Sequence, residues 1–177
     1  MIKIYYIDKD YINYLKKFEK RVPNTQYATN ERFFIEIKIK NSKHKYYAPI
    51  SSFNQKQYTN LLFKNNKNEV MGSIRFSYMI PAPKECVKLV DLANKEEKYR
   101  NYLSKNIRSL TKINKRTQNF GNFIYNERVK GNDEKLKGHS IDFRAMETLC
   151  SDYKKEIKNE KIKRVNKNKS KGMAIWR

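Results

Sequence analysis

The sequence predicts an α+β protein in which a small, curved antiparallel sheet, forming a partly open barrel, carries added α-helices. Three observations predict this fold. Short runs of β-branched and aromatic residues, separated by polar turns, fill the first half of the chain. Apolar residues at helical spacing begin near residue 96. The final stretch, residues 154–177, is basic with few apolar residues, so we expect one domain over residues 1–177 that ends in a basic C-terminal helix or arm.

The first half of the chain is expected to supply the sheet. We expect strands at residues 2–7, 33–40, 46–50, 61–63 and 70–76, and an extended segment at residues 79–83. Within residues 33–40, Ile35, Ile37 and Ile39 alternate with charged residues, so the isoleucines should share one face. Residues 41–43 form a turn, which makes this strand and the next a hairpin.

One helix is expected between the first two strands. Asp8 is a suitable N-cap, and Tyr11, Tyr14 and Leu15 follow at helical spacing. The polar residues 24–30 then predict a loop.

The second half is expected to be helical. From residue 96 the apolar positions can share one helical face, and the run continues or restarts towards residue 124. The glycine-flanked residues 131–138 predict a loop, and Ser140 is a suitable N-cap for a last helix.

The charge of the chain points to a polyanionic partner. Forty Lys and Arg residues stand against eighteen Asp and Glu, a formal net charge of +22. Such a charge destabilises a compact state by self-repulsion unless a polyanion neutralises it. A genome rich in A and T would also raise Lys and Asn, but it should raise the acids too, and they lag.

Several classes of protein are disfavoured. Cys86 and Cys150 lie far apart and predict buried thiols rather than a metal site. Acidic residues are sparse and mostly neighbour lysines, which argues against a two-metal nuclease, and we expect neither metal nor cofactor. The chain shows no transmembrane run, signal peptide or basic amphipathic helix with a strong apolar face, so we expect a cytoplasmic protein without a membrane partner.

Two arrangements of residues could cleave RNA without a metal. The two histidines, His44 and His139, could act as base and acid, although surface histidines are the more common interpretation. Alternatively, residues 51–56 (SSFNQK) offer hydroxyls, an amide and a cation directly after a strand, which could orient the 2′-hydroxyl of the substrate and stabilise charge on its phosphate. On spacing alone, a polar loop with serines in turns is the better explanation of these residues.

Several segments, in order, resemble the ToxN/AbiQ family of type III toxin–antitoxin endoribonucleases. They are residues 11–15 (YINYL), 22–23 (VP), 34–37 (FIEI), 44–52 (HKYYAPISS), 79–83 (MIPAP) with 89–92 (LVDL), and 138–153. No single segment decides the assignment, but the ordered set runs nearly end to end.

The resemblance implies a fold and a catalytic centre. The fold would be a curved antiparallel barrel related to the MazF and Kid toxins, with added helices. Ser52 would lie at the cleavage centre with Ser51 beside it, and Tyr11 would line the site. Arg32 falls where the family often has a lysine. The family's basic residue shortly after the serine is replaced by Asn54, and Lys56 follows two residues later, so either Arg32 or Lys56 could be the main phosphate-binding cation.

The resemblance also implies a reaction and partners. Attack by the 2′-hydroxyl would leave a 2′,3′-cyclic phosphate and a 5′-hydroxyl. The partners would be cellular and phage RNA substrates and a pseudoknotted antitoxin RNA from tandem repeats, processed by the toxin, bound to it and inhibiting it, in a closed cyclic assembly. Expected RNA-binding residues are Asn54, Lys105, Arg108, Lys112, Lys115, Arg116, Lys163 and Arg164. A non-catalytic RNA- or DNA-binding module remains the alternative, since charge and thirteen tyrosines would suit it equally.

Overall fold

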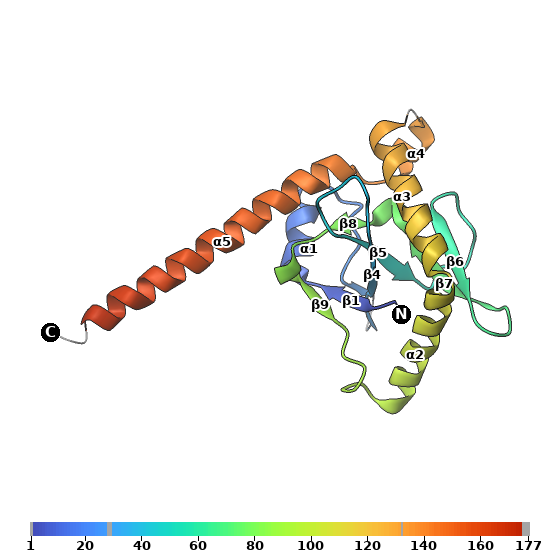
Figure 1. Cartoon of the computed structure of the whole chain (residues 1–177), viewed down its shortest axis with the longest axis horizontal. Helices are drawn as coiled ribbons and strands as arrows, with labels where there is room; N and C mark the ends of the chain where they lie inside the picture. The colour runs from blue at the N-terminus through green and yellow to red at the C-terminus, as the bar shows by residue number, and fades with distance from the viewer. Residues whose placement is uncertain (1, 28–29, 132, 175–177) are drawn as a thin grey trace.

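An antiparallel sheet forms the centre of the protein, with α-helices packed around it (Figure 1). The computed structural model describes residues 2–27, 30–131 and 133–174, with side chains described for residues 2–25, 31–131 and 133–163. The strands are β1 (Ile4–Ile7), β2 (Gln26–Tyr27), β3 (Asn30–Glu31), β4 (Phe34–Ile37), β5 (Tyr46–Ser51), β6 (Asn60–Lys64), β7 (Val70–Arg75), β8 (Ile80–Pro81) and β9 (Val87–Leu89). The helices are α1 (Lys9–Lys16), α2 (Glu97–Lys112), α3 (Asn114–Lys130), α4 (Glu134–His139) and α5 (Phe143–Ala174), with 3-10 turns η1 (Phe76–Tyr78) and η2 (Lys84–Cys86). The α+β prediction is confirmed.

Strand β5 is the central element of the sheet. The strand order is β6-β7-β5-β4-β1-β9, and β8 also pairs with β5. Its first residues, Tyr46 and Tyr47, pair with β8, whereas Ile50 and Ser51 pair with β7. The other edge of β5 pairs with β4 in a continuous register. The end of β5 therefore lies between two neighbouring strands, which hold its backbone on both sides.

The predicted strand at residues 33–40 is shorter than expected. Its isoleucines are buried as predicted, and Phe34 on the opposite face is also fully buried. Beyond Ile37, however, the backbone no longer pairs with a strand. The side-chain amide of Gln118 bonds Lys38 N (2.8 Å) and Glu36 O (3.0 Å) instead. The side-chain amide of Asn122 likewise accepts from Lys40 N and donates to Lys38 O. Side chains of helix α3 therefore satisfy the backbone hydrogen-bonding groups that a neighbouring strand would otherwise pair with.

A glycine allows α3 to lie this close to the sheet. A Cβ on Gly121 would be 2.5 Å from the Cγ2 atom of Ile37 and 3.3 Å from the ring of Phe76. The first distance is shorter than Cβ atoms tolerate and the second is already tight, so any side chain here would have to displace Ile37 or the helix.

Capping residues explain where several helices begin. The Asp8 carboxylate accepts hydrogen bonds from the backbone N–H of Asp10 and Tyr11, as predicted for α1. Asp142 does the same for Arg144 and Ala145 at the start of α5. The prediction that Ser140 caps this helix is therefore wrong.

Three local elements were missed. The predicted loop at residues 24–30 contains the short pair β2–β3. The predicted loop at residues 131–138 contains most of helix α4, because the Asp133 carboxylate accepts a hydrogen bond from Leu136 N and Leu136 is fully buried. Strand β9 closes the edge of the sheet beside β1 and had no clear sequence signal.

The C-terminal segment is one long helix that projects from the body of the protein (Figure 1). Its first turns pack against the core through Phe143 and Met146, and Tyr153 and Ile157 also contact it. Farther along, Ile162 is 50% exposed, so this part of α5 buries little apolar surface.

Candidate functional site

Sheet register brings Arg32 beside the predicted serine loop. Phe34 pairs with Pro49, and Ile50 N donates to the carbonyl of Phe33 at 2.8 Å. Continuing this register by one residue places Arg32 next to Ser51, on the same face of the sheet. The end of β5 and the residues just before β4 therefore meet, although nineteen positions separate Arg32 from Ser51 in the sequence.

The serine hydroxyls differ in their surroundings. Ser51 Oγ is half-buried and accepts a hydrogen bond from Phe53 N at 3.2 Å, which turns the chain out of β5. Ser52 is exposed, as is Asn54 farther along the loop. Ser51 thus shapes the loop, and Ser52 presents a hydroxyl to solvent beside it.

A glycine on β7, Gly72, packs closely against the backbone of Ser51 at the end of β5. A Cβ on Gly72 would be 2.4 Å from the carbonyl oxygen of Ser51, and Gly72 has a φ of +156°. Any side chain here would displace the backbone of Ser51. The position of the loop therefore depends on close backbone packing between β5 and β7.

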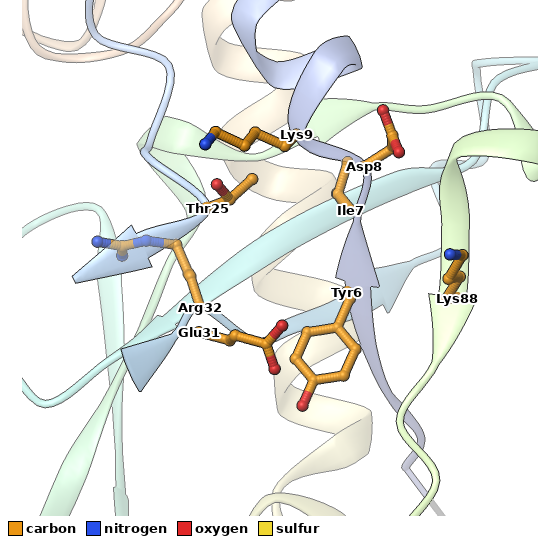
Figure 2. A pocket seen from close by; sticks show the side chains of 8 residues that line it. All are labelled: Tyr6, Ile7, Asp8, Lys9, Thr25, Glu31, Arg32 and Lys88. Carbon is orange, nitrogen blue, oxygen red and sulfur yellow. The ribbon is translucent and has the colours of Figure 1, made fainter. Parts of the chain in front are cut away.

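Arg32 is anchored by the segment that precedes β2. Its backbone N–H donates to Thr25 O (2.7 Å), and its Nε donates to Asn24 O (2.8 Å). These bonds orient the guanidinium at the rim of a cavity of about 210 Å³. The cavity is lined by Tyr6, Ile7, Asp8, Lys9, Thr25, Glu31, Arg32 and Lys88 (Figure 2).

The cavity beside Arg32 is cationic. In Figure 2 the side chains of Lys9 and Arg32 extend to the same side as Thr25, and Lys88 stands across β1. Two acids, Asp8 and Glu31, also line the cavity and leave a small excess of positive charge. Asp8 caps α1, and burial, followed by the interaction with Glu31, raises the pKa of the Tyr6 hydroxyl. Of these three cations, Arg32 is the one that sheet register places next to Ser51, and its guanidinium suits a phosphate group.

Lys56 has a different environment from Arg32. Its Nζ donates to the carbonyl of Asn60 and, at 3.0 Å, to that of Gln57. It also lies 5.5 Å from the centre of the Phe120 ring on α3. Burial, and then the charge of Arg116, lower the pKa of Lys56. Lys56 thus ties its own loop together and lies against α3, and it does not line the Arg32 cavity.

Tyr11 lies in the core rather than beside the serines. It is fully buried, its hydroxyl donates to Pro81 O at 2.7 Å, and its ring packs 5.0 Å from that of Tyr153. Burial raises the pKa of Tyr11 well above its ordinary value. Pro81 pairs with Tyr46, at the opposite end of β5 from Ser51. The structure therefore does not bring Tyr11 to the serine loop.

The predicted RNA-binding cations form a continuous face along α2 and α3. Lys105, Arg108 and Lys112 are exposed at spacings of three and four residues, which places them on one side of α2. Lys115 and Arg116 continue this face across the junction of the two helices, where both are exposed. Lys163 on α5 is also exposed, and the side chain of Arg164 lies outside the described residues.

An open groove of about 610 Å³ lies on this cationic face. Lys112, Lys115 and Arg116 line it together with Phe120 and Phe123. Phe123 is 44% exposed, unusual for a phenylalanine, and was missed in the sequence because it fits the apolar face of a helix. Aromatic rings between cations are typical of surfaces that bind single-stranded nucleic acid.

The two histidines lie in different environments. His44 lies near Glu147, and burial lowers its pKa. His139 ends α4 and lines another cavity, described below. Within residues 2–27, 30–131 and 133–174, no group of three or more His, Cys, Asp or Glu could hold a metal ion. In the same part of the chain, no helix has the length and apolarity needed to cross a membrane.

Comparison with known proteins identifies relatives over most of the chain. Residues 3–151 match the model of the ToxN toxin family of type III toxin–antitoxin systems. Endoribonuclease ToxN of Pectobacterium atrosepticum is 29% identical, covering 89% of this chain and 97% of its own. Endoribonuclease ToxN of Bacillus thuringiensis subsp. kurstaki is 28% identical, covering 86% and 84%.

A solved structure supports the same relationship. It belongs to a bacterial type III toxin–antitoxin system in which a non-coding RNA pseudoknot selectively inhibits the toxin. It has a TM-score of 0.78 and 27% identity, and the match covers 86% of this chain and 98% of that one.

Proposed function

Because this chain belongs to the ToxN toxin family of type III toxin–antitoxin systems, we propose that it is an endoribonuclease toxin. The relatives named above carry that activity in their names, and they match nearly the full length of both chains. The observation that carries the proposal is the convergence of Arg32 with the Ser51–Ser52 loop at the end of β5, next to a cationic cavity.

The reaction is attack by the substrate's own 2′-hydroxyl on the adjacent phosphorus, without a metal. The O2′–P bond forms, the P–O5′ bond breaks, and the 2′ proton leaves while the 5′ oxygen gains one. The products are a 2′,3′-cyclic phosphate and a 5′-hydroxyl. The protein needs only to align the nucleophile and stabilise charge on the phosphate.

The chain's own residues divide this work. The Arg32 guanidinium binds a non-bridging oxygen of the scissile phosphate, since it is anchored from Asn24 and Thr25 and faces the cavity. Ser52 donates its exposed hydroxyl to the same phosphate, and Ser51 holds the loop in register. Lys56 positions the loop from the α3 side and leaves Arg32 as the main cation.

An inhibitory RNA is the partner we propose. The cationic face of α2 and α3 and the groove with Phe120 and Phe123 suit phosphates and unstacked bases. This RNA would be a pseudoknot cut from a tandem-repeat precursor by the toxin itself and would remain bound in a closed cyclic assembly. We place the protein in the cytoplasm, where cellular and phage RNA are its substrates, and we regard its sheet as a variant of the MazF and Kid fold.

One experiment tests the activity against the alternative of a non-catalytic RNA-binding module. Purified protein is incubated with a mixed RNA pool in excess EDTA, alongside Ser52→Ala. We expect the wild-type protein to cleave the RNA and leave cyclic phosphate at the new 3′ ends. Ser52→Ala should not cleave the RNA but should still bind it. RNA with a 2′-deoxy group at the scissile nucleotide should resist, and cutting of that substrate would exclude the mechanism.

A further inference from the structure

A second cavity lies beside residues 57–59, in the loop that follows β5. It has a volume of about 280 Å³ and lies between that loop, η1 and α4. Its polar and aromatic lining comes from Gln57, Tyr58, Arg75, Tyr78, Lys135 and His139. The cavity therefore combines aromatic rings with cationic and amide groups, and nothing in the cleavage step described above uses it.

Arg75 is the central side chain of this cavity. Its guanidinium lies 4.7 Å from the centre of the Tyr78 ring and 5.2 Å from that of Phe53, so two aromatic rings hold it by cation–π contacts. Nη2 donates to Gln57 Oε1 at 3.2 Å. Nε is buried and donates to no acceptor in the described part of the chain. A guanidinium has five donors, so this one is held in place with hydrogen-bonding capacity in reserve.

Sheet register places this cavity one step from the serine loop. Ser51 pairs with Ser73 on β7, and Arg75 follows two residues later. Two residues of a strand span about 7 Å, and side chains two apart share a face. Arg32 and Ser51 are therefore neighbours across the sheet, and Arg75 lies on the next strand, displaced by two residues along β7. That spacing suits successive nucleotides of an extended RNA strand.

We propose that this cavity is a subsite for the nucleotide adjacent to the scissile phosphate. The inference rests on the proposed function and deepens it. The base of that nucleotide stacks against the exposed ring of Tyr58, while Arg75 and Gln57 bind its edge. Lys135 and His139, both exposed on α4, flank the path of the phosphate. The subsite gives the enzyme a preference for the base at one position beside the cut.

The Tyr58 ring is positioned for such stacking. It is 51% exposed, and its hydroxyl donates to Asp133 Oδ2 at 3.1 Å. That bond joins the loop to the start of α4 and orients the ring without covering it. An exposed ring that is already oriented loses little conformational entropy when a base stacks on it.

The experiment measures cleavage preference and binding separately. A randomised RNA pool is cut by the wild-type protein, Tyr58→Ala and His139→Ala, and the ends are sequenced. Phe18→Ala is the control, because that aromatic ring is also exposed, at 63%, but follows α1 and lies outside the surfaces proposed to bind RNA. We expect Tyr58→Ala and His139→Ala to weaken the base preference at one flanking position and Tyr58→Ala to raise KM on the order of tenfold, with kcat largely kept. Unchanged preference and KM in both variants would overturn the proposal.

Binding provides a readout that does not need cleavage. An oligonucleotide with 2-aminopurine beside a 2′-deoxy scissile nucleotide should lose fluorescence on binding to wild-type protein and to Phe18→Ala, and much less on binding to Tyr58→Ala. If the wild-type protein quenches the probe but cuts no RNA, the subsite survives and the proposed function fails. If it cuts RNA but quenching is the same in all variants, only the subsite fails.

Discussion

The hydroxyl of Tyr46 donates a 3.0 Å hydrogen bond to the carboxylate of Glu147, which ties the first residue of β5 to helix α5. The same carboxylate oxygen accepts from Tyr125 on α3 (2.8 Å) and from Ser42 (2.6 Å). Its second oxygen accepts from Arg144 (3.1 Å). Burial alone would raise the pKa of Glu147, but the hydrogen bonds outweigh it and hold the pKa below its ordinary value. A charged carboxylate therefore joins the sheet to two helices.

Glu147→Gln should destabilise the protein in a pH-dependent way. At neutral pH we expect the free energy of unfolding to fall by about 1–3 kcal/mol, because charge-assisted hydrogen bonds are replaced by weaker ones. Since the folded pKa is depressed, the stabilisation is complete above the unfolded pKa of about 4.3 and is lost as pH falls through the folded value. Urea unfolding from pH 7 to pH 3 measures this. Glu134→Gln, an exposed change, should have little effect; a pH-independent difference for Glu147→Gln would contradict the assignment.

Gly72→Ala should impair cleavage by moving the serine loop. The new Cβ would have to displace the carbonyl of Ser51, which is backbone and cannot rotate away. We expect a loss of kcat on the order of tenfold or more, together with lower stability, in RNA cleavage and urea unfolding assays. Gly138→Ala is the matched control, since a Cβ there meets nothing within 4 Å. Equal behaviour of the two variants would show that the loop tolerates displacement.

Replacing the two candidate cations separately should distinguish their roles. Arg32→Ala should reduce kcat on the order of 10²-fold or more, because it removes charge beside the phosphate, and Arg32→Lys should restore part of it. Lys56→Ala should act mainly on the 51–60 loop, through the lost bonds to Gln57 and Asn60. We expect Lys56→Ala to lower thermal stability and leave more activity than Arg32→Ala. The reverse order in single-turnover rates would make Lys56 the phosphate-binding residue.

The two adjacent serines should differ in their contribution. Ser52→Ala should lower kcat about 10²- to 10³-fold, as expected for loss of one preorganised hydrogen bond to the transition state. Ser51→Ala should be milder, since Ser51 Oγ accepts a bond from Phe53 N and acts on loop shape. Toxicity in cells and cleavage of RNA in solution both measure this. If Ser51→Ala is inactive while Ser52→Ala remains active, the catalytic hydroxyl belongs to Ser51 instead.

Removing residues 161–177 should weaken RNA binding without unfolding the protein. Ile157 packs against the core, whereas Ile162 is half-exposed, so residues 161–163, the deleted residues with described side chains, bury little. Lost phosphate contacts should flatten the slope of log K against log salt. Binding titrations between about 50 and 300 mM salt measure this slope. A variant with Lys161, Lys163 and Arg164 changed to Gln tests charge alone, and an unchanged slope in both would exclude α5 from the RNA contact.

Local patterns in the sequence were enough to predict most elements of the fold. The alternation of Ile35, Ile37 and Ile39 predicted a buried strand, and Asp8 predicted the start of α1. The excess of Lys and Arg predicted the cationic face along α2 and α3. The buried strand and the helix start depend on residues within a few positions of one another, so periodicity and capping residues predict them directly.

The resemblance to a family located the serine loop, but it did not give the arrangement around it. Tyr11 matched the family's pattern and yet lies in the core, bonded to Pro81 O. Arg32 and Lys56 were equivalent candidates from the sequence. Only the pairing of β4 with β5 put Arg32 beside Ser51, and only packing against α3 drew Lys56 away.

What the sequence by itself determined was therefore the type and order of most elements and the sign of the surface charge. Tertiary structure decided which side chains meet. Gln118 and Asn122 end the pairing of β4, Arg32 lies next to Ser51, and Ser51 pairs with Ser73, two residues before Arg75. The physical reason is that strand register and helix packing bring together residues that are distant in the chain. Their partners follow from the shape of the whole core, which no local pattern encodes.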